Sequence, residues 1–440
     1  LVILDEAHEF STSGSAQQKA AHRLAQLPRV PVIALTGSLM GGYASSLFAN
    51  AWALSRRFRS QFDLDEKPSF VTRYGYRKLL VTPTAAKPLP GTRSYGRQSD
   101  RTDGDGFEIR QLGEAPGVLP LYILEHILPT GLVMHKGDLD EELPPCSEEP
   151  TPVRTSPDDF LDAKLLAEFS RLRAALVSRI HADRGTERAG LLWGAMSELP
   201  SYLDLANEEC GPFVIRYPDE AGGEEVASGF AFPASWRSPK ERWLLAELRA
   251  ELRTGLNAGR RAIVFLRHTG NRGFLRRLHR LIAEDLEQAP TFLDPAKVPT
   301  GVRERWLNEV IVGGCRVLLV HPKAVQTGLN NLTAFHTAIW FEGPDYDARV
   351  TRQANGRPHR IGQTEPVRLI YPYYADTLQK AALDLVARKI TASLQVDGLS
   401  LAGALEAAGA LSEEDRLHAT AALAIGQALY RAATGGGVSR

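Results

Sequence analysis

An acidic pair follows the first apolar run of the chain and has residue types that can act on a nucleotide. Asp5 and Glu6 come directly after Val2-Ile3-Leu4, a short run of branched apolar residues that is typical of a buried parallel strand. Parallel sheets bind ligands at the carboxyl ends of their strands. There, one carboxylate can hold Mg²⁺ on nucleotide phosphates, and its neighbour can orient or deprotonate the attacking water. A charged turn is the simpler alternative, but the apolar strand before it favours the nucleotide site.

A second group with chemical potential lies far along the chain, within VTRQANGRPHRIGQT at residues 350–364. Gln353, Gly356, Arg357 and Arg360 have the spacing QxxGRxxR. Two arginines on a glycine turn suit a developing phosphate charge, because guanidinium is planar, permanently charged and bidentate. A surface-exposed basic turn is the alternative. Pro358 lies between the arginines and would clash inside a helix, so we expect this segment on a turn.

Four segments of the chain together resemble superfamily-two helicases. They occur in the order of motifs II, III, V and VI of that superfamily: DEAH at 5–8, ALTGS at 34–38, VLLVHPKAVQTGLNNL at 317–332 and QANGRPHRIGQT at 353–364. GLNNL followed by GRPHRIGQT is similar to the Swi/Snf-type branch, whose members are DNA-translocating ATPases. The resemblance spans about residues 1–395 and implies an ATP- and Mg²⁺-dependent motor that moves on double-stranded DNA.

The resemblance implies a role for each matching residue of the first two motifs. Asp5 would bind Mg²⁺ and belong to the nucleotide site, and Glu6 would be the general base. His8 and Thr36 would couple the state of the nucleotide to the interface between two lobes.

The last two motifs supply the remaining predicted site residues. Gly328 would contact the nucleotide, and Thr327, Leu329 and Asn330 would contact the DNA backbone. Gln353 would act at the lobe interface, and the two arginines would be catalytic fingers that stabilise the transition state. We expect both the acidic pair and the arginines at the carboxyl ends of their sheets.

The chain also departs from the family. Leu39 stands where the family has proline after its motif III, and no GxxxxGK[ST] phosphate loop occurs in the 440 residues. We therefore expect a C-terminal fragment or a truncated reading frame, and negligible ATPase activity from these 440 residues. Two alternatives stay open for the function: a strand-separating DNA helicase, and a non-catalytic DNA-binding scaffold derived from a truncated motor.

The pattern of apolar runs predicts an α/β fold with two RecA-like lobes, the first incomplete, and a largely helical insertion between them. Residues 1–60 would be the end of lobe 1, 61–235 the insertion and linker, 236–395 lobe 2, and 396–440 a helical tail. Within the insertion, Pro, Gly and charge predict loops over 81–120 and 136–158, whereas periodic apolar residues predict a helix over 159–182.

Composition limits the classes of protein that the chain can represent. The formal net charge is zero, so contacts with nucleic acid must come from local basic surfaces. The three cysteines form no CxxC pair, which argues against a zinc or disulfide framework and favours a reducing cytosol. No membrane span is predicted. We expect a bacterial, cytoplasmic, nucleoid-associated protein that works with partner proteins of a repair, defence or mobile-element system.

Overall fold

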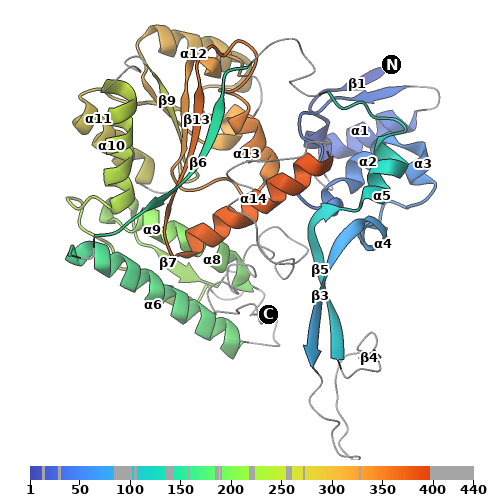
Figure 1. The fold of residues 1–440 in the computed structure, drawn as a ribbon, viewed down its shortest axis with the longest axis horizontal. Helices are drawn as coiled ribbons and strands as arrows, with labels where there is room; N and C mark the ends of the chain where they lie inside the picture. The colour runs from blue at the N-terminus through green and yellow to red at the C-terminus, as the bar shows by residue number, and fades with distance from the viewer. Residues whose placement is uncertain are drawn as a thin grey trace, which may run out of the picture. The chain divides into compact units, whose positions relative to one another are not determined.

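The computed structural model describes most of the chain up to residue 396 (Figure 1). The described ranges are 1–11, 15–27, 31–83, 102–103, 107–134, 143–156, 158–183, 188, 191–217, 223–253, 260–270, 273–326 and 329–396. They form two compact units, one before and one after the junction of Leu132 and Val133. The predicted tail, Thr327 and Gly328 lie outside the described residues.

The first unit begins with the strand that the sequence predicts. β1 (Val2–Leu4) pairs in parallel with β2 (Val32–Ala34), and α1 (Ala16–Gln26) connects them. Leu4, Ala7 and Ala21 form the small core beneath this pair. The opposite face of the two strands carries Ile3 and Ile33, which pair in register and are 57% and 45% exposed.

An aromatic cluster holds the rest of the first unit together. Its helices are α2 (Phe48–Leu54), α3 (Arg56–Arg59), α4 (Lys67–Tyr74) and α5 (Pro120–Tyr122). Rings from these helices and from Phe62, which follows α3, meet at centroid distances of 5.0–6.1 Å: Phe48, Phe58, Phe62, Phe70, Tyr74 and Tyr122. Such edge and tilted contacts stabilise the packing beyond burial alone.

The prediction of loops over 81–120 is wrong at both ends of that range. β3 (Gly75–Pro83) and β5 (Phe107–Val118) form a long antiparallel hairpin, with β4 (Thr102–Asp103) beside β5 (Figure 1). The register pairs Val81 with Ile109 and Pro83 with Phe107. The glycines, prolines and charges in the sequence between the two strands concealed the hairpin.

The second unit contains an open sheet of six strands in the order β10-β11-β9-β12-β13-β6, and every neighbouring pair is parallel. The strands are β6 (Cys146–Val153), β9 (Ala262–Phe265), β10 (Thr291–Leu293), β11 (Val317–Val320), β12 (Thr337–Trp340) and β13 (Val367–Tyr374). The predicted α/β class is confirmed, and the sheet with its flanking helices is consistent with a RecA-like lobe.

Both faces of this sheet are covered by helices, as its fully buried central strands require. One face packs against α10 (Pro239–Arg253) and α11 (Phe274–Leu286), and the other against α12 (Arg303–Val312), α13 (Ala348–Asn355) and α14 (Leu378–Val396) (Figure 1). Alternate residues of β9 enter the two cores: Ala262 and Val264 face one, Ile263 and Phe265 the other.

The prediction of a loop over 136–158 is wrong for β6, which pairs with β13 along eight residues. The sequence of this strand is typical of a loop because it contains Pro150, Pro152 and the acidic pair Glu148 and Glu149. Prolines are tolerated on an edge strand, where alternate backbone N–H groups face outward, and they also block further strand addition.

The predicted helix over 159–182 is confirmed as α6 (Phe160–Ala182). Leu165, Leu172 and Leu176 of α6 are fully buried in the same core as β9. This part of the segment predicted as an insertion therefore shares its hydrophobic core with the large sheet. No helix among the described residues is long and apolar enough to cross a membrane.

Candidate functional site

The predicted residues that the structure describes fall into two groups, one in each unit. We name Asp5, Glu6, His8 and Thr36 the acidic half-site. We name Gln326, Leu329, Asn330, Gln353, Arg357 and Arg360 the arginine half-site. Each is described by its own contacts.

The turn after β1 forms the acidic half-site. The Glu6 amide donates to Asp5 Oδ1 (3.0 Å), and the Ala7 amide donates to the carbonyl of Leu35 (2.8 Å). Glu6 has φ +49°, a left-handed conformation that costs about 1–2 kcal/mol for a residue with a Cβ atom. The exposed Asp5 carboxylate and the partly exposed Glu6 carboxylate thus follow the carboxyl end of β1, as predicted.

His8 connects this turn to the segment after β2. Its Nδ1 lies 3.1 Å from Thr36 Oγ1 and 3.3 Å from Glu6 Oε2, and the side chain is 6% exposed. The Ser38 amide donates to Thr36 Oγ1 (3.1 Å). The structure therefore brings the predicted residues of the segments 5–8 and 34–38 together through side chains, although 28 positions separate His8 from Thr36.

The arginine half-site joins the segments 317–332 and 353–364 in the same way. Gln326 Nε2 donates to Gln353 Oε1 (3.1 Å), and Arg357 donates to the carbonyls of Gln326 and Leu329. Arg360 Nη1 donates to Asn330 Oδ1 (2.6 Å). The two arginines are partly exposed and follow Gly356, at the end of α13.

The expectation that these arginines lie at the carboxyl edge of their sheet is wrong. α13 starts after the carboxyl end of β12 and runs back across the face of the sheet, as a crossover helix must. The turn beyond it leads into the amino end of β13. Gln363 Nε2 accordingly donates to the carbonyls of Thr333 and Phe335, which precede β12.

Gln363 is an organising residue of this turn that the sequence analysis missed. Its amide nitrogen also donates to the Pro358 carbonyl (2.9 Å), and its Oε1 accepts from the amides of Thr364 and Glu365. The side chain is only 6% exposed. A glutamine after a basic turn gives no signal of such contacts, because its carbonyl partners lie about 30 positions away.

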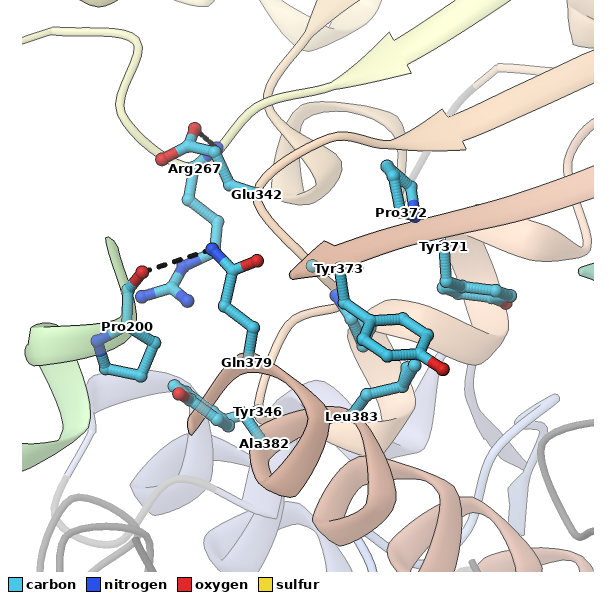
Figure 2. Close-up of a pocket in the computed structure, with 12 residues that line it drawn as sticks. Pro200, Arg267, Glu342, Tyr346, Tyr371, Pro372, Tyr373, Gln379, Ala382 and Leu383 are labelled. Carbon is cyan, nitrogen blue, oxygen red and sulfur yellow. Dashed lines mark hydrogen bonds between the residues drawn. The ribbon is translucent and has the colours of Figure 1, made fainter. Parts of the chain in front are cut away.

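A pocket in the second unit contains none of the predicted residues. It lies beside the carboxyl ends of β12 and β13 (Figure 2). Its lining consists of Pro200, Arg267, Glu342, Gly343, Pro344, Tyr346, Tyr371, Pro372, Tyr373, Gln379, Ala382 and Leu383. The described residues hold no cluster of three or more His, Cys, Asp or Glu side chains with the arrangement of a metal site.

Comparisons with solved structures include a remote likeness. No known family matches the chain, and neither does any curated protein. A solved structure of the C-terminal part of the Fun30 ATPase domain is 14% identical, with a TM-score of 0.40. The match covers 58% of this chain and 96% of that one.

Proposed function

We propose that the chain is part of an ATP-dependent motor that moves along double-stranded DNA. The observation that carries the proposal is the contact of Arg357 and Arg360 with the segment 326–330, together with the contact of His8 with Thr36. Four segments resemble superfamily-two motifs, and these contacts join the first to the second and the third to the fourth. Unrelated surface turns would have no reason to pair in this way.

Arg360 is suited to receive a phosphate. Its described partner is the neutral amide oxygen of Asn330, and among the described residues no carboxylate lies within ion-pair distance of it. Its charge is therefore free to act on an anion, and a guanidinium can bind phosphate oxygens in a bidentate manner. In the proposal, this half-site stabilises the charge that develops during phosphoryl transfer.

The acidic half-site fits Mg²⁺ and an attacking water. Asp5 offers an exposed carboxylate whose Oδ1 is oriented by the Glu6 amide, and hard carboxylate oxygens are the ligands that Mg²⁺ prefers. Bound there, the ion would neutralise charge on the nucleotide phosphates. Glu6 would take the proton of the attacking water, and His8 would fix the Glu6 carboxylate relative to Thr36.

DNA binding by the 440-residue chain is the first test. We expect binding of a fluorescent duplex to weaken steeply as salt rises, because phosphate contacts release counterions. Asn330→Ala should weaken that binding, because Asn330 is among the residues expected at the DNA backbone. Arg360→Ala should leave it unchanged, because the proposal places Arg360 at the transferred phosphate. Arg305→Ala is a surface control, since Arg305 is 85% exposed on α12 and is paired with Glu309. A chain that binds no duplex at low salt would contradict the proposal.

Turnover is the second test, in a version of the protein that carries a phosphate loop. Arg357→Ala or Arg360→Ala should each lower turnover by about a thousandfold, with nucleotide affinity changed much less. Glu6→Gln should retain ATP binding and abolish hydrolysis, because it removes the base and leaves Asp5. Wild-type turnover in these variants would remove the substituted residues from the mechanism. Absence of turnover in the unsubstituted protein, with DNA binding intact, would favour the scaffold alternative.

The β3–β5 hairpin favours strand separation as a second candidate activity. It is a long two-stranded ribbon that extends from the helices of the first unit (Figure 1). A rigid hairpin can hold the strands of a duplex apart, whereas a translocase needs no such element. Displacement of a labelled strand from a forked duplex distinguishes the two activities, and a version without the hairpin is the control.

A further inference from the structure

The large sheet has a topological switch point between β9 and β12. These strands are neighbours, but the chain leaves β9 toward β10 at one edge and leaves β12 toward β13 on the other side. In open α/β sheets, the two diverging connections leave a crevice at the carboxyl ends of such strands. Here the crevice is crossed by charged side chains of the protein itself.

Glu342 is the central residue of this crevice. It follows β12, its side chain has no exposed surface, and its Oε2 accepts from the backbone amides of Arg267 (2.7 Å) and His268 (3.0 Å) after β9. Its Oε1 is paired with Nδ1 of His268. Figure 2 shows the bond between Glu342 and Arg267 at the edge of the pocket. One carboxylate therefore fastens the start of the β12–α13 connection to the end of β9.

A second carboxylate closes the crevice from the helical layer. Glu198, the last residue of α8 (Trp193–Glu198), lies 3.4 Å from Arg267 Nη2 and 3.6 Å from His268 Nε2. The Arg267 guanidinium also lies over the ring of Tyr346, 5.1 Å from its centroid, and the Tyr346 hydroxyl donates to the Ser197 carbonyl. We name Glu342, His268, Arg267 and Glu198 the switch-point clasp.

The clasp lies at the head of the helix that ends in the arginine half-site. Five residues after Glu342, Asp347 caps α13 by accepting from the Arg349 amide (3.0 Å). The helix is eight residues long, and Arg357 follows directly after its C-cap Gly356. Any rotation of the β12–α13 connection is therefore passed along one rigid helix to the arginines.

We propose that Glu342 is a positioning residue for Arg357 and Arg360, and that it acts through its pairing with His268. The catalytic use of the arginines rests on the proposed function, but their positioning by Glu342 does not. The clasp would hold the start of α13 in one orientation, so that the turn at its other end presents both guanidinium groups from a fixed position. Glu198 would tie this orientation to the helical layer.

The charges in the clasp make its stability depend on pH. Burial alone would lower the pKa of His268, but its bonds to Glu198 and Glu342 raise that pKa to about 9. Burial alone would raise the pKa of Glu342, but the bonds from His268 hold it below the ordinary range. Other charged groups near the clasp from neighbouring elements are Asp204, Lys240, His321 and Asp345. The contribution of His268 is complete below its ordinary pKa near 6.5, and is lost as pH rises through about 9.

Amide hydrogen exchange of the 440-residue chain tests the inference without nucleotide or DNA. Glu342→Gln should raise the exchange of residues 348–360 by about tenfold or more, since it replaces a buried charge-assisted pair by a weaker one. β9 and β11 should keep their protection. Glu309→Gln is the matched control, because Glu309 is 62% exposed on α12 and should change nothing beyond its own helix.

A double variant tests whether Glu342 and His268 act as one unit. Exchange in Glu342→Gln/His268→Gln should equal that of Glu342→Gln alone, because the same pairing is lost in both. Additive effects, unchanged exchange in 348–360, or an equal rise across β9 and β11 would each overturn the inference.

The wild-type protein gives an independent measurement where a variant does not fold. After correction for intrinsic rates, protection of 348–360 should fall between about pH 8 and pH 10, while that of 303–312 should not. Constant protection across this range would overturn the inference. None of these results depends on DNA binding or turnover, so the proposed function stands or fails separately.

Discussion

Arg277 of α11 joins three parts of the second unit through a side chain with no exposed surface. Its Nε and Nη2 donate to the two carboxylate oxygens of Glu241 on α10 (2.6 and 2.9 Å). Its remaining bonds go to Glu209 Oε2 (2.5 Å), the Ala234 carbonyl (2.9 Å) and the Trp236 carbonyl (2.5 Å). Every described donor direction is thus used, and we expect Arg277→Met to be among the most destabilising single changes in this unit.

The magnitude follows from what the substitution leaves behind. Methionine replaces most of the volume but not the charge, so Glu241, whose side chain is 3% exposed, stays buried without its cation. Removing one partner of a buried pair costs about 3–5 kcal/mol. Arg280 lies three residues after Arg277 on α11, is 41% exposed and pairs with the same Glu209. Arg280→Met removes only exposed pairs and should cost at most about 1 kcal/mol.

Urea unfolding followed by tryptophan fluorescence measures this difference. Trp236 stacks on Phe232 at a centroid distance of 4.3 Å and contributes a backbone bond to Arg277, so its emission reports on the region directly. The chain has two compact units, so the transition that belongs to the second unit must be fitted separately. Its midpoint should fall strongly in Arg277→Met, with an unchanged slope.

A double variant tests whether the buried charge of Glu241 causes the loss of stability. In Arg277→Met/Glu241→Gln no charge is left buried, and the glutamine can still accept from the Ser238 amide as Glu241 does (2.8 Å). We expect this double variant to recover a large part of the lost stability. Equal losses in Arg277→Met and Arg280→Met, or no recovery in the double variant, would refute the explanation from buried charge.

Three further predictions concern the two half-sites and the sheet behind them. Asn355→Ala should cost about 1–3 kcal/mol in urea unfolding, because the buried indole N–H of Trp340 loses its acceptor (2.9 Å); a loss below about 0.5 kcal/mol would contradict this. Glu6→Gly should raise the melting temperature of the first unit by relieving the left-handed backbone, whereas Glu6→Ala should not, and equal effects would exclude strain as the cause. Bonds and charges from His268 lower the pKa of Glu342, and those from Arg349 lower the pKa of Asp347, in both cases against the opposing effect of burial. The two carboxylates contribute fully to stability above their ordinary pKa values of 4.5 and 3.8, and this contribution is lost as pH falls below those values. The urea concentration at the unfolding midpoint of the second unit should therefore decrease as pH is lowered from about 5 to about 3. A constant midpoint would contradict the prediction.

The central strands and most helices could be predicted from the sequence because continuous or periodic apolar residues indicate which of their positions are buried. β9, β11 and β12 have every residue buried, and α6 has a buried residue at every third or fourth position. β6 and the β3–β5 hairpin could not be predicted in this way. β6 is an edge strand that tolerates Pro150 and Pro152, and the hairpin is split by a long segment of loop-like composition.

The site could be predicted where chemistry is concentrated in short segments, and not where it depends on the fold. The contacts of His8 with Thr36 and of Arg360 with Asn330 join residues that the motifs already single out. Glu342 and His268 are 74 positions apart, and neither belongs to a motif to which the sequence assigns a catalytic or binding role. Only the neighbouring positions of β9 and β12 in the sheet bring them together.

The clasp and the arginine half-site occupy the two ends of the same helix, and this has a consequence for how the second unit can move. At 1.5 Å per residue, α13 is about 12 Å long, which is too short for the helix to bend appreciably. At its far end, Asn355 is held by Trp340 of β12 and by the Tyr371 hydroxyl of β13 (2.6 Å). α13 is therefore fixed to the sheet at both ends, and the arginines can change position only if the clasp or the Asn355 contacts open. In the proposed motor, motion of Arg357 and Arg360 should then be motion of the whole second unit, with the turn carried as part of a rigid body.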